Sequence, residues 1–172
     1  MKNFSKMNKV IAAAIVLAGF ATNANAQSDA SASTTAILVQ PLTIVKDIDM
    51  HFGTVAASAT AGTIVLGYLN DVTATGGAAV IDDALATTAV FTVEGQANEG
   101  FDITLSATSI VLSNGTDDLT VDNIEVEEGT DNTLDGTGTL VLHVGATLQV
   151  VADAPAGIYT NADELEITVA YN

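Results

Sequence analysis

Two histidines and 21 carboxylates are the side chains of this 172-residue chain that could carry acid–base or hydrolytic chemistry. A serine hydrolase needs a histidine that is held by a carboxylate and faces a hydroxyl group. His51 and His143 each lie between two apolar residues, so in a strand both imidazoles point to the polar face, where histidine is ordinarily solvated. The chain has no Gly-x-Ser-x-Gly nucleophile motif and no cysteine. These residues therefore predict no nucleophilic active site.

Glycoside hydrolysis is the other chemistry that the acids could support, because it needs two carboxylates near each other. With 21 acids, chance pairs are inevitable. Such enzymes normally hold their sugars with aromatic platforms and arginines, and this chain has no Trp and no Arg. We therefore predict that the chain is not an enzyme.

The acidic segments could instead bind a metal ion, and their spacing tests this. Residues 131–136 (Asp-Asn-Thr-Leu-Asp-Gly) resemble the start of a calcium loop, but Thr133 and Leu142 stand where an EF-hand needs acids. An acidic surface loop is the favoured interpretation of these segments. The open alternative is a looser calcium site, whose ligands would come from Asp117, Asp118, Asp122, Glu127, Glu128 and Asp131. Zinc is not expected, because cysteine is absent and the two histidines are far apart in sequence. We predict no metal site, no cofactor and no calcium requirement for folding.

The first 26 residues have the pattern of a secretory signal peptide. Three lysines precede an apolar run at residues 10–20, and Ala24-Asn25-Ala26 supplies a small-x-small cleavage site. The apolar run is too short to span about 30 Å of hydrocarbon. We therefore expect cleavage before Gln27, an exported protein and no membrane span.

The chain that remains after cleavage is strongly acidic. Residues 27–172 carry one cation, Lys46, and all 21 acids, which gives a formal charge of 1 − 21 = −20. Such a surface repels phosphate backbones, so nucleic-acid binding is excluded. Because there is no cysteine, stability must come from burial and strand pairing and not from disulfides.

Apolar and polar residues alternate with a period of two along much of this chain, for example over 101–106 and 164–171. Gly, Asn, Asp and Pro residues separate such runs at short intervals. The pattern predicts roughly nine or ten short strands, no helix and an immunoglobulin-like β-sandwich. Pro41 cannot donate to a strand ladder, so it should divide an extended lead (27–40), with an edge segment at 36–39, from the domain (41–172).

Several motifs together resemble a known family. They are Val39-Gln40-Pro41-Leu42-Thr43-Ile44 running to Phe52-Gly53-Thr54-Val55, then Gly145-Ala146-Thr147-Leu148, then Pro155-Ala156-Gly157-Ile158-Tyr159-Thr160, and the closing Ile167-Thr168-Val169-Ala170-Tyr171-Asn172. The set resembles a family of secreted bacterial domains described as a domain of unknown function. That family is similar in turn to spore coat protein U and the archaic chaperone–usher pilins. The resemblance covers nearly the whole of the chain after the signal peptide.

The resemblance implies an incomplete immunoglobulin-like sandwich of pilin type, whose gap is filled by the N-terminal extension of a neighbouring subunit. It implies further copies or related pilin-like subunits as partners, together with a periplasmic chaperone and an usher. The assembly strand would consist of Ala36, Ile37, Leu38 and Val39, and the wall of the acceptor groove of Leu165, Ile167, Val169 and Tyr171. The chain departs from pilins of the spore-coat-U type because it has no cysteine for their disulfide.

Our leading hypothesis is therefore a non-catalytic structural subunit of a cell-surface filament or coat, exported through the periplasm of a Gram-negative bacterium. The alternative is a monomeric secreted binding module for a glycan or an ion. Pairing of residues 27–39 within their own domain would favour the module, and a lead left free would favour the filament.

Overall fold

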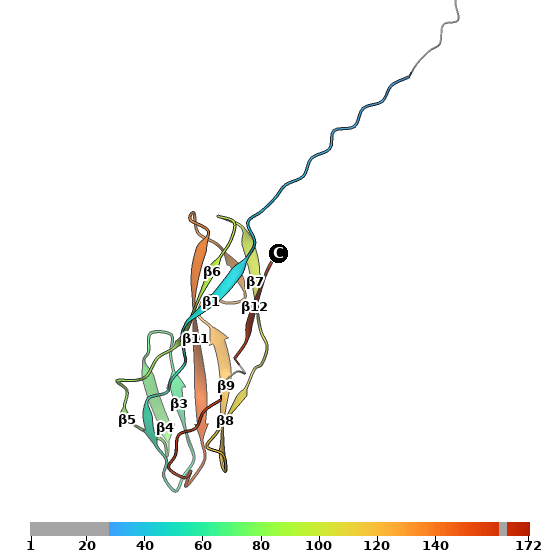
Figure 1. Cartoon of the computed structure of the whole chain (residues 1–172). Helices are drawn as coiled ribbons and strands as arrows, with labels where there is room; N and C mark the ends of the chain where they lie inside the picture. The colour runs from blue at the N-terminus through green and yellow to red at the C-terminus, as the bar shows by residue number, and fades with distance from the viewer. Residues whose placement is uncertain (1–27, 162–164) are drawn as a thin grey trace, which may run out of the picture. The chain divides into compact units, whose positions relative to one another are not determined.

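The computed structural model describes residues 28–161 and 165–172, which form twelve β-strands and no helix (Figure 1). The predicted signal peptide, residues 1–26, and Gln27 lie outside these described residues. The strands are β1 (Thr43–Ile48), β2 (Thr54–Ala56), β3 (Gly62–Leu66), β4 (Val72–Gly76), β5 (Ala79–Asp82), β6 (Ala89–Glu94), β7 (Gly100–Leu105), β8 (Ile110–Ser113), β9 (Asp118–Val126), β10 (Asp131–Thr133), β11 (Thr139–Val150) and β12 (Ile167–Tyr171). The all-β prediction is confirmed, whereas the expected count of nine or ten strands is too low.

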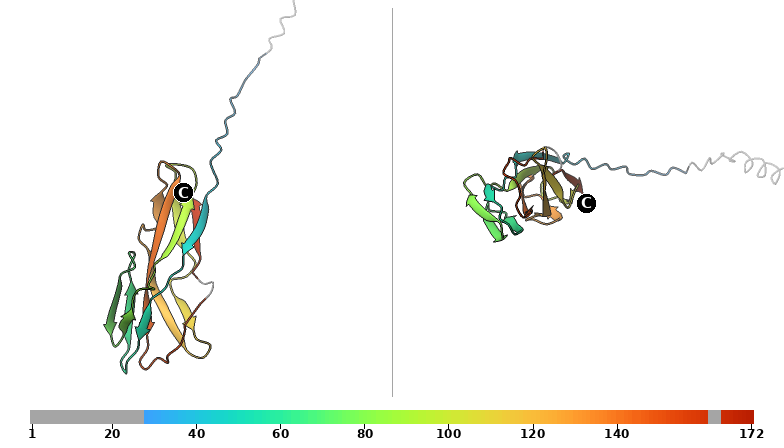
Figure 2. Two further views of the ribbon diagram at one scale, coloured as in Figure 1. Left: turned by 60° about the vertical axis from the view of Figure 1, so that its left-hand side comes forward. Right: turned by 90° about the horizontal axis from the view of Figure 1, so that it is seen from below.

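The strands form three antiparallel sheets, an arrangement consistent with a β-sandwich. The largest sheet has the order β1-β6-β11-β3-β4, and β9 joins it by pairing with both β11 and β8. A second sheet has the order β10-β7-β12, and β2 pairs with β5 in a third. In Figures 1 and 2, β3, β4 and β5 lie together on one side of the domain, away from β12. None of the described residues forms a helix that could cross a membrane.

β11 is the longest strand, and it holds the large sheet together. Its first half pairs with β6, and its second half pairs with both β3 and β9. Residues 144–148 are all buried, although a strand with one wet face would alternate between buried and exposed. The run Val-Gly-Ala-Thr-Leu at these positions suits this environment, because its members are small or apolar.

The core is built from aliphatic side chains and three phenylalanines, as the composition requires. The most deeply buried large side chains are Phe101, Ile64, Leu66, Leu134, Leu142, Val93, Val121 and Val144. In β7 the expected alternation is confirmed: Phe101 and Ile103 are buried, whereas Asp102 and Thr104 are exposed. Among the described residues, no buried side-chain nitrogen or oxygen lacks a hydrogen-bond partner.

The segment before β1 has no regular secondary structure. Residues 28–42 form no strand, so the edge segment that the sequence suggests at 36–39 is not a strand here. The side chains of Ile37 and Leu38 are 87% and 91% exposed, and that of Val39 is 50% exposed. Residues Leu38–Asn172 form one compact unit, to which the described residues before Leu38 do not belong.

Candidate functional site

β1 and β12 are two of the strands that have an edge which no other described strand covers. β1 pairs with β6 alone, and β12 pairs with β7 alone, among the strands that the structure describes. β1 (cyan) and β12 (dark red) come close to each other near the C-terminus of the chain (Figure 1). An uncovered strand edge exposes N–H and C=O groups that can pair with another strand. The free edges of β1 and β12 are therefore the first element of the candidate site.

Tyr171 joins the two strands at one end. Its hydroxyl group donates a hydrogen bond to the carbonyl oxygen of Gln40 at 2.8 Å, just before β1, and accepts one from the backbone N–H of Gln96 at 2.7 Å. The side chain of Gln96 also accepts a long hydrogen bond of 3.5 Å from the Gln40 N–H. These bonds hold the C-terminal strand, the loop after β6 and the start of β1 together.

Away from Tyr171, a groove of about 1230 Å³ with polar and apolar lining opens between β1 and the segment that leads into β12. One side is formed by β1 and the segment after it, including Ile44, Met50 and Phe52, and the other by residues 157–161 and 165–167. The floor consists of core side chains from four strands: Phe91 of β6, Ile110 and Leu112 of β8, Leu119 and Val121 of β9, and Leu148 of β11. The groove therefore reaches the hydrophobic core itself.

The residues that the sequence predicts for the groove wall divide into two pairs. Leu165 and Ile167 line the groove. Val169 and Tyr171 do not line it; they are half-buried and pack against the core near the start of β1. The predicted assembly residues Ala36, Ile37, Leu38 and Val39 all lie exposed in the segment without strand structure.

The floor of the groove was not identified from the sequence. Residues such as Phe91 and Leu148 show the period-two pattern of any core strand, and nothing local indicates that a covering strand is missing above them. Phe52 lies in a stretch that the family resemblance does mark, but only as a motif and without a role.

Several polar groups of the groove have partners within the domain. Lys46 and Asp49 make an ion pair through Nζ and Oδ1. His51 accepts a hydrogen bond on Nδ1 from the backbone N–H of Gly53 at 2.8 Å, and its main chain bridges to Thr87.

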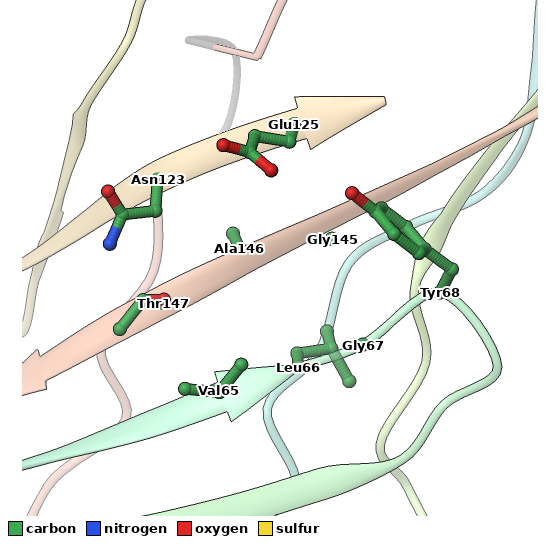
Figure 3. Close-up of a pocket in the computed structure, with 9 residues that line it drawn as sticks. All are labelled: Val65, Leu66, Gly67, Tyr68, Asn123, Glu125, Gly145, Ala146 and Thr147. Carbon is green, nitrogen blue, oxygen red and sulfur yellow. The ribbon is translucent and has the colours of Figure 1, made fainter. Parts of the chain in front are cut away.

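A second, smaller hollow of about 200 Å³ lies over β11 and its neighbours (Figure 3). The register of β9 against β11 shifts between Gly145 and Thr147, and Asn123 has a left-handed φ of 48° at this irregularity. Tyr68 lies above Gly145, where an added Cβ would come within 3.1 Å of its ring. Burial, and after it the negative charges of nearby glutamates, raise the pKa of Tyr68.

Among the acids whose side chains the structure describes, Asp117, Asp118 and Asp122 belong to no group of three or more metal-ligating side chains. The carboxylate of Asp122 accepts hydrogen bonds from the Gln149 side chain at 3.0 and 3.1 Å. Glu127 and Glu128 instead approach His143, whose Nδ1 lies 3.1 Å from Glu128 Oε1. This is the one group of three or more metal-ligating side chains within the part of the chain that the structure describes. The interpretation of His143 as a merely solvated side chain is therefore wrong, because it is bonded to a carboxylate.

The hydrogen bonds of Tyr171 give a stability prediction. Tyr171→Phe leaves a half-buried N–H and a carbonyl without their partner, which should cost about 1–3 kcal/mol. We expect the melting temperature to fall by roughly 3–8 °C, as measured by circular dichroism. The matched control is Tyr159→Phe, whose hydroxyl donates at 2.9 Å to Pro155 in an exposed loop and should matter much less. Equal effects of the two substitutions would contradict a role for Tyr171 in joining the strands.

Comparison with known proteins places the domain in a family without giving it a function. No curated protein and no solved structure matches the chain. A family model described as "Domain of unknown function (DUF4402)" matches residues 42–171. This match covers the domain from just before β1 to the end of β12 and confirms the expected membership of a domain-of-unknown-function family, whereas the likeness to spore coat protein U and pilins stays a prediction. The chain therefore belongs to the DUF4402 family.

Proposed function

We propose that this protein is a non-catalytic structural subunit of a bacterial cell-surface filament or coat, in which a strand of one copy enters the groove of the next. The observation that carries the proposal is the groove of about 1230 Å³ between β1 and the segment that leads into β12, which is lined by core side chains. β1 on one side has an uncovered edge, β12 with its own uncovered edge begins at the groove with Ile167, and core side chains form the floor. An added strand would therefore gain backbone hydrogen bonds and apolar burial at the same place.

The proposed occupant is the lead of a second copy, residues 28–39. This segment forms no strand, and its three large apolar side chains, Ile37, Leu38 and Val39, are exposed. Twelve extended residues reach about 40 Å, and a strand as long as β12 needs only about 17 Å. The lead is therefore long enough to fill the groove and still connect to its own domain.

The place of the groove supports the immunoglobulin-like, pilin-type assignment. It lies between β1, the first strand of the domain, and the segment that leads into β12, the last described strand. This is where the pilin resemblance expects a missing strand. The same resemblance carries the proposal that the subunit is exported through the periplasm, assisted by a chaperone and an usher, and assembles with copies of itself or related subunits.

The charge of the subunit is compatible with controlled assembly. At −20 for residues 27–172, copies repel one another at low ionic strength. Added salt screens this repulsion over a Debye length of about 10 Å at 0.1 M, whereas apolar burial in the groove is not weakened. Assembly should therefore strengthen with salt.

The experiment compares the chain that begins at Gln27 with one that begins at Gln40. We expect the longer chain to form oligomers or filaments at high protein and salt concentrations, and the shorter one to stay monomeric, by sedimentation velocity and electron microscopy. If both are stable monomers under all conditions, the filament proposal fails and the monomeric secreted binding module replaces it.

A further inference from the structure

A cluster of metal-ligating side chains lies outside the groove, where β9 ends beside β11. Nδ1 of His143 is 3.1 Å from Glu128 Oε1 and 3.6 Å from Glu127 Oε2. One ligand atom from each of these three residues can be chosen so that all lie within 4.8 Å of one another. Two carboxylates and one imidazole therefore converge on a single point.

The backbone fixes this arrangement. The N–H of Glu127 donates to the carbonyl oxygen of His143 at 2.9 Å, which extends the pairing of β9 with β11 by one residue. The N–H of His143 donates in turn to the second carboxylate oxygen of Glu128 at 3.1 Å. Two of the side chains are partly shielded from solvent, Glu128 at 18% and His143 at 32% exposed, whereas Glu127 is 44% exposed.

The charge at this cluster is not balanced by any lysine or arginine. The one cation of residues 27–172, Lys46, pairs with Asp49 in the groove. The pKa of Tyr68 is raised mainly by burial, and the negative charges of Glu125, Glu127 and Glu128 raise it further. A bound dication would neutralise two adjacent carboxylates at once.

We propose that Glu127, Glu128 and His143 form a binding site for a divalent transition-metal ion of the zinc type. An imidazole nitrogen combined with carboxylate oxygens suits Zn²⁺, Cu²⁺ or Ni²⁺, whereas Ca²⁺ and Mg²⁺ prefer oxygen ligands alone. Ligands at about 2.0–2.2 Å from zinc lie about 3.4 Å apart in a tetrahedron, so small side-chain rotations bring these three onto one ion. The remaining coordination positions are open to water or to an external ligand.

The sequence did not indicate this site, because zinc sites are recognised by closely spaced histidines and cysteines. Here Glu128 and His143 are separated by 15 residues, and antiparallel pairing of β9 with β11 brings them together. The proposed ligand set contains only His143, so the distance in sequence between the two histidines does not count against it.

The test measures Zn²⁺ binding to the chain beginning at Gln27 by isothermal titration calorimetry, in an excess of Mg²⁺ that occupies weak acidic sites. We expect one saturable Zn²⁺ site in the wild type. His143→Gln and Glu127→Gln should each weaken it by about tenfold or more, as loss of a ligand requires. Glu125→Gln removes the same charge two residues from Glu127 without removing a ligand, and His51→Gln removes the other histidine; both should bind nearly as the wild type does.

Copper provides a second readout that does not depend on affinity. The electron paramagnetic resonance spectrum of the Cu²⁺ complex should show a single nitrogen ligand in the wild type and in His51→Gln, and none in His143→Gln. Circular dichroism of each variant checks that it is folded. Absence of saturable Zn²⁺ binding in the wild type, or equal binding by His143→Gln, would overturn the proposal.

Discussion

Of two adjacent substitutions in the lead, Ile37→Asp and Leu38→Asp, only one should abolish assembly. Successive side chains of a strand point to opposite faces, so in the groove of a second copy one of these residues faces the apolar floor and the other faces solvent. Either Ile37 and Val39 or Ala36 and Leu38 then serve as anchors, depending on the register. The same charge is added in both variants, at neighbouring positions that are both exposed before assembly.

The expected difference between the two variants is large. Burial of an Ile or Leu side chain contributes on the order of 1.5–3 kcal/mol, and a carboxylate in its place adds the cost of burying a charge. The inward variant should therefore weaken assembly by about a hundredfold or more, whereas the outward variant should stay within a few-fold of the wild type. Sedimentation velocity at high salt measures both, because screening removes the general effect of the added charge.

Leu69→Asp serves as the control for an added charge outside the lead and the groove, since Leu69 is 81% exposed in the loop between β3 and β4. It should assemble as the wild type does. If Ile37→Asp and Leu38→Asp weaken assembly equally, the lead does not enter the groove as a strand. If both variants assemble as the wild type does, neither residue anchors the lead in the groove.

The sequence predicts those features of the fold that depend on neighbouring residues alone. Alternation in β7 and β12 is a local property, so the buried faces of Phe101, Ile103 and Ile167 follow from their spacing alone. β2 and β10 have three residues each, too few to show a period of two, and this is one reason why the strand count was low.

The remaining differences arise from contacts between distant segments. Val169 and Tyr171 continue the alternation of Leu165 and Ile167, yet they lie outside the groove because the start of β1 comes close to β12 there. In the same way, no local pattern shows that the core strands under the groove lack a cover, or that Glu128 meets His143. Pairing of strands far apart in the sequence decides each of these features.

Moving the lead from the start of the chain to its end should convert an assembling subunit into a more stable monomer. The variant begins at Gln40 and carries residues 28–39 after Asn172, joined by a short Asn-Gly turn. Antiparallel strands can be joined by a two-residue turn, so the appended segment can fold back along the free edge of β12 and lie over Phe91, Val121 and Leu148. The groove would then be filled within the same molecule, and no segment would remain to enter another copy.

The thermal stability of this variant reports on the groove without any need for filaments. Burial of the anchors, Ile37 and Val39 or Ala36 and Leu38, together with the backbone hydrogen bonds to β12 should outweigh the cost of ordering the segment. A net gain of about 1–2 kcal/mol should raise the melting temperature by roughly 3–8 °C above that of the chain beginning at Gln40. A control with Ile37→Asp and Leu38→Asp in the appended segment places a carboxylate in the groove in either register, so it should lose the gain. If the unmodified segment raises the melting temperature no more than this control does, the groove is not an acceptor for the lead, whatever the state of assembly of the full chain.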